Sequence, residues 1–196
     1  MRWPFVVWAL GCSGTPRPPP VATHAELPTA VEVADEDRGI VLDQGVIACG
    51  ELRTELPVAL AITEASQAAV VAASPHGVIR VARTTDSAAA DLLQTWAVLH
   101  QQLEGPLAFG LQLDANLSYR DGTLVIDYAM AHGTRLRFAY RRTPRCTVSA
   151  IERAAEPSGA VDAVAGPVRM TWEPVTSMMQ AAGAYECWAR RGSCRD

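Results

Sequence analysis

The clearest pattern along the chain is an alternation of apolar and polar residues that begins near position 107. From residue 107 to residue 119 the odd positions are apolar and the even ones mostly polar, which is typical of a β-strand with one buried face. Asp121-Gly122 is a strong signal for a two-residue hairpin turn. The turn predicts four apolar pairs across the two strands: Tyr119 with Leu124, Leu117 with Ile126, Ala115 with Tyr128, and Leu113 with Met130.

A third strand is expected to follow a loop at His132-Gly133-Thr134, with Met130 opposite Leu136 and Tyr128 opposite Phe138. The chain therefore predicts an antiparallel meander over about 107–142 with one apolar face. Three arginines fall on the other face, which we expect to be solvated. The predicted register sets Asp127 diagonally between two of them, so we expect charges to pair across strands among Asp127, Arg135, Arg137 and Arg141.

The apolar spacing becomes helical over residues 86–104, where four large residues recur at i, i+4, i+7 and i+11: Leu92, Trp96, Leu99 and Leu103. Thr85 is the N-cap expected from the sequence, and Gly105 followed by Pro106 is a typical helix end. We expect this amphipathic helix to cover the apolar face of the meander.

The remaining segments complete the predicted α+β fold. Short stretches rich in valine, isoleucine and alanine predict strands at 39–48, 57–63, 67–73 and 77–83, and a helix over 57–73 is an open alternative. Residues 74–77 predict a tight turn. After the meander we expect a loop over 154–167, a strand near 168–172 and a C-terminal helix over about 174–190 that has Pro174 in its first turn. Residues 38–196 are expected to form a single domain.

Residues 13–37 contrast with these segments because they carry five prolines, small polar residues and a run of acids. Such a segment has too little apolar surface to offset its ordering entropy, so it predicts a disordered tether. The net charge of −4 does not favour nucleic acid as a partner. The basic residues are all arginine, and the absence of lysine excludes a P-loop lysine and a Schiff-base lysine.

Four cysteines lie beyond the tether, and sequence alone allows three ways to pair them: Cys49, Cys146, Cys187 and Cys194. The short interval between Cys187 and Cys194 favours a local bridge, which would leave Cys49 to pair with Cys146. Four free thiols are the alternative. No Cys-x-x-Cys pair is present and no histidine lies near a cysteine at ligand spacing, so we predict no metal site.

The arginine set is the strongest candidate for binding chemistry. Guanidinium groups suit phosphates and carboxylates, so Arg135, Arg137 and Arg141 are candidates for binding an anion such as a lipid phosphate or a cell-wall carboxylate. Their alternative role is structural pairing. The four histidines, at positions 24, 76, 100 and 132, show no ligand spacing, and no nucleophile motif is present. We therefore predict neither a catalytic residue nor a cofactor.

The N-terminus adds a targeting pattern. A single cation, Arg2, precedes the apolar residues 3–10, and Ala9-Leu10-Gly11-Cys12 ends the segment. This order resembles the signal peptide of a bacterial lipoprotein, although Ala9 stands where that family usually has leucine. The resemblance implies that residues 1–11 are removed, that Cys12 carries lipid, and that residues 12–37 tether the domain. Ser13, in place of aspartate, implies the outer membrane, facing the periplasm.

These observations together predict a lipid-anchored cell-envelope protein that acts as a non-catalytic binding, accessory or scaffold component. Its expected partners are the membrane, through the lipid, and an envelope protein or an anionic cell-wall or lipid group. One alternative is a periplasmic carrier of a small ligand or anion, with an apolar pocket near Trp96. A further alternative is an envelope hydrolase, which needs a histidine or carboxylate pair converging in a cleft.

Overall fold

A computed structural model describes residues 39–84, 87–105, 112–130, 133–166 and 172–191. Within these residues the chain forms a mostly antiparallel β structure with a few helices, so the predicted α+β class is confirmed. The larger sheet has eight strands, in the spatial order β11 (Glu173–Ser177), β7 (Gln112–Arg120), β8 (Thr123–Ala129), β9 (Arg135–Arg142), β10 (Cys146–Arg153), β6 (Gly77–Arg83), β5 (Ala69–Ser74) and β4 (Ala61–Ala65). The smaller sheet has three: β1 (Ile40–Asp43), β2 (Val46–Cys49) and β3 (Leu52–Glu55).

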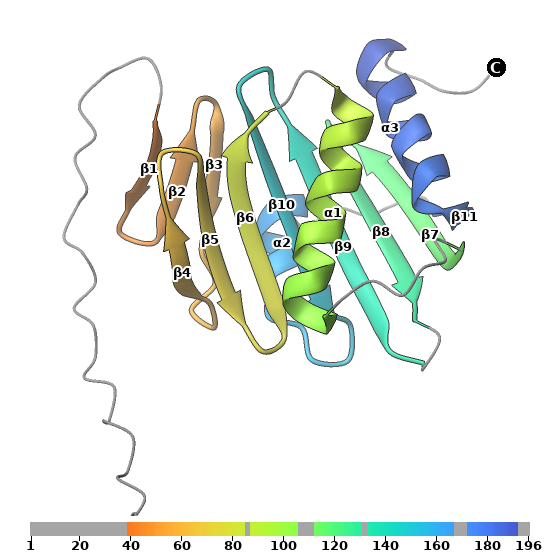
Figure 1. Cartoon of the computed structure of the whole chain (residues 1–196), viewed down its shortest axis with the longest axis horizontal. Coiled ribbons are helices and arrows are strands. Elements are labelled where there is room, and N and C mark those ends of the chain that lie inside the picture. The colour runs from red at the N-terminus through yellow and green to blue at the C-terminus, as the bar shows by residue number, and fades with distance from the viewer. Residues whose placement is uncertain (1–38, 85–86, 106–111, 131–132, 167–171, 192–196) are drawn as a thin grey trace, which may run out of the picture.

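Both faces of the large sheet are covered (Figure 1). Helices α1 (Ala88–Glu104) and α3 (Met178–Arg191) lie in front of the sheet in this view, and the short helix α2 (Ala160–Ala165) lies behind it. The core behind the sheet also contains residues of the small sheet, including Ile47 and Leu52. The prediction that the second face of the meander is solvated is therefore wrong at its centre, where Val125 and Ala139 are buried, whereas Arg135 and Arg141 are exposed. The central strands β10 and β6 are apolar on both sides, as in sheets buried on both faces.

The predicted register of the first hairpin is confirmed. Strands β7 and β8 pair Tyr119 with Leu124, Leu117 with Ile126 and Ala115 with Tyr128. Strand β8 ends at Ala129, so the predicted pair of Leu113 and Met130 lies outside the ladder.

The predicted register of the second hairpin is wrong by two residues, because β9 sets Leu136 opposite Tyr128 and Phe138 opposite Ile126. The turn comes one residue earlier in the chain than expected: the Met130 amide donates to the Thr134 carbonyl at 2.7 Å, and the Gly133 amide donates to the Met130 carbonyl at 2.9 Å. Since side chains alternate with a period of two, this shift leaves the apolar residues on the expected face.

The N-terminal half contains more strands than predicted. Residues 39–48 form two strands rather than one, joined by Gln44 and Gly45, which both have positive φ (45° and 81°) as a tight hairpin turn requires. The predicted strand at 77–83 matches β6, and β4 and β5 exclude the alternative helix over 57–73. Strands β3 and β10 were not predicted.

The helices also begin at other residues than the sequence predicts. Helix α1 is capped by Ser87, whose hydroxyl accepts from the Ala90 amide at 3.2 Å, whereas Thr85 lies outside the described residues. The predicted apolar stripe is buried at Leu92, Trp96 and Leu99. Gly105, with φ of 85°, ends the helix as expected.

The predicted helix over 174–190 begins only at Met178. Pro174 lies instead in β11, which is an edge strand and therefore tolerates a residue without an amide hydrogen. The strand predicted near 168–172 falls mostly outside the described residues. The predicted loop over 154–167 contains α2. Among the described residues, none of the helices has the length and apolar character that crossing a membrane requires.

Candidate functional site

The most connected polar cluster lies around Glu152, near the end of the unpredicted strand β10. This strand is central, with β9 on one side and β6 on the other. Val148, Ala150 and Glu152 point to the face that α2 covers, which leaves the Glu152 side chain with 0% exposure. A buried carboxylate is costly unless donors surround it. The geometry around Glu152 therefore decides whether it is a reactive or a structural group.

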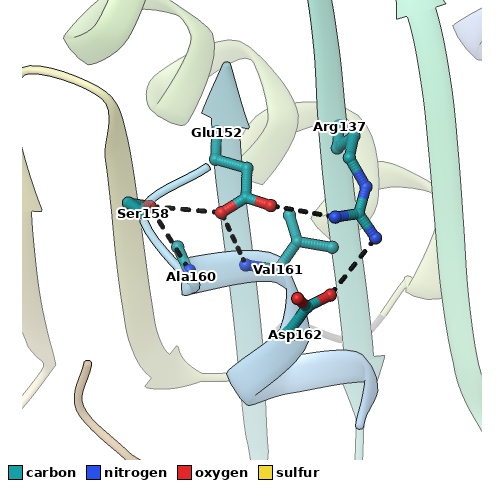
Figure 2. A network of polar contacts seen from close by, with 6 residues as sticks. All are labelled: Arg137, Glu152, Ser158, Ala160, Val161 and Asp162. Carbon is teal, nitrogen blue, oxygen red and sulfur yellow. Dashed lines mark hydrogen bonds and ion pairs between the residues drawn. The ribbon is translucent and has the colours of Figure 1, made fainter. Parts of the chain in front are cut away.

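Glu152 accepts three hydrogen bonds (Figure 2). Arg137 on β9 donates from Nη1 to Oε1 at 3.1 Å. The Ser158 hydroxyl and the Val161 amide both donate to Oε2, at 3.2 and 3.4 Å. Arg137 also donates from Nη2 to Asp162 at 3.2 Å, so that one guanidinium joins the sheet to α2. We infer that Glu152 is a structural group, because its oxygens are occupied from within the protein.

A glycine makes room for this cluster. Gly77 is paired with Glu152 across β6 and β10, and an added β-carbon there would lie 1.9 Å from the Ser158 hydroxyl oxygen. Ser158 accepts from the Ala160 amide at 3.3 Å, which satisfies one donor of the first turn of α2. The sequence predicts the turn at residues 74–77 but not the contact of Gly77 with a segment about eighty residues away.

The three predicted anion-binding arginines do not form one site. Arg135 pairs with Asp127 at 2.9 Å, near one end of β9. Arg137 lies under α2, where its side chain is 26% exposed and bound to two acids. Arg141 is exposed near the other end of β9, and its side chain makes no hydrogen bond or ion pair with the described residues. Asp127 lies directly opposite Arg137 in the ladder rather than diagonal to it.

The cysteines are described in part. Cys49 of β2 and Cys146 of β10 form a disulfide that joins the two sheets, so this predicted bond is confirmed. Cys187 lies in α3. Its predicted pairing with Cys194 stays a prediction, because Cys194 lies outside the described residues, as does Cys12.

A second polar cluster lies inside the core between α1 and the sheet. Asp91 of α1, only 4% exposed, accepts a hydrogen bond of 2.8 Å from the Tyr140 hydroxyl. Burial raises the pKa of Asp91, while the Tyr140 hydrogen bond and the nearby charges of Arg142 and Arg80 act in the opposite direction. Burial and the neighbouring Asp91 carboxylate raise the pKa of Tyr140. Both groups are enclosed, so we infer that the pair positions α1 on the sheet.

The described histidines have separate surroundings. His76, in the turn between β5 and β6, lies 3.2 Å from a Glu156 carboxylate oxygen. His100, 2% exposed, packs against Trp96 and Tyr128, and burial lowers its pKa. His24 and His132 lie outside the described residues. Among the residues that the structure describes, no group of three or more histidine, cysteine or acidic side chains is placed to hold a metal ion.

An open groove of about 630 Å³ runs between the small sheet and α2. It is lined by a few apolar residues together with one cation and one acid: Val46, Arg53, Glu55, Leu56, Pro57, Gly159 and Ala163. The groove lies apart from Trp96, where the carrier hypothesis expects a pocket. Trp96 itself is 2% exposed in the core, and its indole N–H donates to the Tyr128 hydroxyl at 3.2 Å.

Comparison of the chain with protein-family models, curated proteins and solved structures found no match. Its function must therefore be argued from its own residues.

Proposed function

We propose that this protein is a lipid-anchored component of the bacterial cell envelope whose folded part binds a partner rather than transforming one. The observation that carries the proposal is the N-terminal order of Arg2, the apolar residues 3–10 and then Gly11-Cys12. Acylation of Cys12 would leave residues 13–37 between the lipid and the folded part. Ser13 in place of aspartate favours the outer membrane.

The disulfide between Cys49 and Cys146 supports an oxidising compartment. Disulfides persist outside the cytoplasm and are rare within it, where thiols are kept reduced. The two cysteines are 97 residues apart in the sequence and both are buried, so the bond belongs to the folded core. An exported chain is the simplest setting for such a bond.

The surroundings of the acidic and histidine side chains support a binding role. Glu152 and Asp91 are buried and hydrogen-bonded within the protein. His100 is buried against Trp96 and Tyr128, and its Nδ1 has no hydrogen-bond partner among the described residues. His76 and Glu156 lie next to each other at the surface, with 3.2 Å between Nδ1 and a carboxylate oxygen. The packed surroundings of Trp96 do not favour the small-ligand carrier, and these separate pairs do not favour the hydrolase.

Intact-mass measurement of the mature protein tests the anchor. The full chain, expressed in a Gram-negative host, is expected in the membrane fraction, with residues 1–11 removed and acyl chains on Cys12. More than one chain is expected, because a single acyl chain anchors only weakly. Cys12→Ala is the control and should abolish both the processing and the added mass. An unprocessed, unacylated wild-type chain in the soluble fraction would overturn the proposal.

A further inference from the structure

One end of the large sheet gathers arginines from turns that are far apart in the sequence. Arg83 is the last residue of β6 and pairs with Cys146 of β10. Arg145 directly precedes Cys146 in the chain. Arg141 on β9 pairs with Thr123, and Thr123 pairs with Arg120 at the start of the next turn. We call this the arginine end, and its exposed members are Arg83, Arg120, Arg141, Arg145, Arg190 and Arg191.

Helix α3 reaches the same end. Trp188 stacks on Tyr119 with ring centroids 4.5 Å apart, next to Arg120 in β7. The last residues of α3, Arg190 and Arg191, therefore lie at this end as well, where Figure 1 shows the helix rising beyond the strands.

The folded part also begins at the arginine end. Ile40, the first residue of β1, pairs with Cys49, which is joined to Cys146 by the disulfide. The Arg145 side chain lies next to Gly50, because an added β-carbon there would meet its Cδ at 3.7 Å. Any anchor on Cys12 is therefore connected to the folded part at the end that carries these arginines.

Two of these charges, those of Arg141 and Arg145, are free to meet a ligand. Arg141 and Arg145 are exposed and make no side-chain hydrogen bond or ion pair with any residue that the structure describes. Arg120 and Arg190 pair with the exposed or half-buried acids Asp121 and Glu186. Glu51, in the turn between β2 and β3, offsets one further charge. A positive surface therefore remains on a chain whose net charge is −4.

We propose that the arginine end is the face that this protein turns towards the membrane, where its free guanidinium groups bind the phosphates of anionic phospholipids. Guanidinium groups bind phosphate oxygens through paired hydrogen bonds, and an anionic lipid surface attracts nearby cations within about one Debye length. The inference rests on the proposed function, because an anchor on Cys12 is what holds this end at the lipid surface.

Flotation with lipid vesicles tests the inference without relying on acylation. The probe is the full chain carrying Cys12→Ser, mixed with vesicles of phosphatidylcholine alone or of phosphatidylcholine with phosphatidylglycerol. The apolar residues 3–10 contribute similarly to both compositions, and the charge of Arg2 is the same in every variant, so the change in the ratio on substituting an arginine isolates the contribution of the arginine end. We expect the ratio to exceed one at low salt and to fall towards one as salt screens the surface.

Arginine variants then locate the binding surface. Arg141→Gln/Arg145→Gln is expected to lower the partition ratio by roughly fivefold for each arginine removed. The matched control is Arg135→Gln, which removes an exposed charge from the opposite end of β9 and should leave the ratio unchanged. Thermal melts of the variants establish that each is folded.

The outcomes separate the two proposals. The inference would be overturned if the probe with all its arginines partitioned equally onto both vesicle types. It would also be overturned if Arg135→Gln lowered the partition ratio as much as Arg141→Gln/Arg145→Gln does. Both results hold whatever the acylation state. Selective binding that Arg141→Gln/Arg145→Gln removes supports the inference even if the mass of the mature chain overturns the lipid anchor.

Discussion

At the scale of single residues, Glu152 shows how a charged side chain is accommodated inside this protein. Its carboxylate is fully buried and faces a guanidinium, a hydroxyl and a backbone amide, which replace the hydration it loses on folding. Asp162 binds the same guanidinium, but its side chain is 65% exposed, so water remains available to it. The two acids share Arg137 and yet should differ strongly in their contribution to stability.

Replacing Glu152 tests this difference. We expect Glu152→Gln to lower the free energy of unfolding by about 2–3 kcal/mol, because a half-buried guanidinium and two further donors lose a charged acceptor. Asp162→Asn should cost less than about 1 kcal/mol, as exposed ion pairs usually do. Urea unfolding monitored by circular dichroism measures both. Equal losses would show that burial does not set the strength of these bonds.

The roles of individual residues were the hardest feature to predict from the sequence. The alternation correctly assigned Arg135, Arg137 and Arg141 to the face opposite Leu136, Phe138 and Tyr140. It could not show that α2 covers Arg137, since the acids that bind it come from β10 and α2. Contacts between segments distant in the sequence leave no local periodicity.

At the scale of elements, α2 illustrates how packing can create a helix where the sequence predicts a loop. The segment has six helical residues, flanked by Gly159 and Gly166, and a helix this short is marginal by itself. Its apolar residues enter the core behind the sheet, and its first turn is bonded to Ser158 and Glu152. The helix is therefore stabilised by its docking site, which Gly77 keeps open.

Two glycine substitutions test the docking of α2. Gly77→Ala should lower the free energy of unfolding by about 1–3 kcal/mol, because its methyl group would overlap Ser158. Gly183→Ala, in α3, has no atom within 4 Å of the added carbon and should stabilise by about 0.5–1 kcal/mol. Denaturant melts compare the two. In the double variant Gly77→Ala/Ser158→Gly part of the loss should return, and no recovery would contradict the steric explanation.

At the scale of the whole molecule, the two sheets are held together by apolar packing and by one covalent bond. Residues of the small sheet, including Ile40, Ile47 and Leu52, share a core with the central strands of the large sheet. The Cys49–Cys146 disulfide joins these layers at the arginine end. It also closes a long loop, so it should restrict the unfolded chain more than a local bridge would.

Removing the disulfide measures this constraint. Cys49→Ala/Cys146→Ala should lower the free energy of unfolding by about 4–5 kcal/mol in the chain-entropy model for a separation of 97 residues. Chemical denaturation under oxidising conditions compares the variant with the unaltered chain. Adding reductant should destabilise the unaltered chain more than the variant, which has no bond between residues 49 and 146 to reduce. A loss below about 1 kcal/mol would contradict a major role for this disulfide.

Features that depend on neighbouring residues could be predicted from the amino-acid sequence. Alternation and the Asp121-Gly122 turn predicted the β7–β8 hairpin and its register, and helical spacing predicted α1, because these signals act over a few residues. The three-dimensional structure was needed to show that the centre of the second face is covered, that α2 forms, and that distant arginines gather at the end where the folded part begins. These features depend on contacts between remote segments, whose free energy appears only when the whole sheet is assembled.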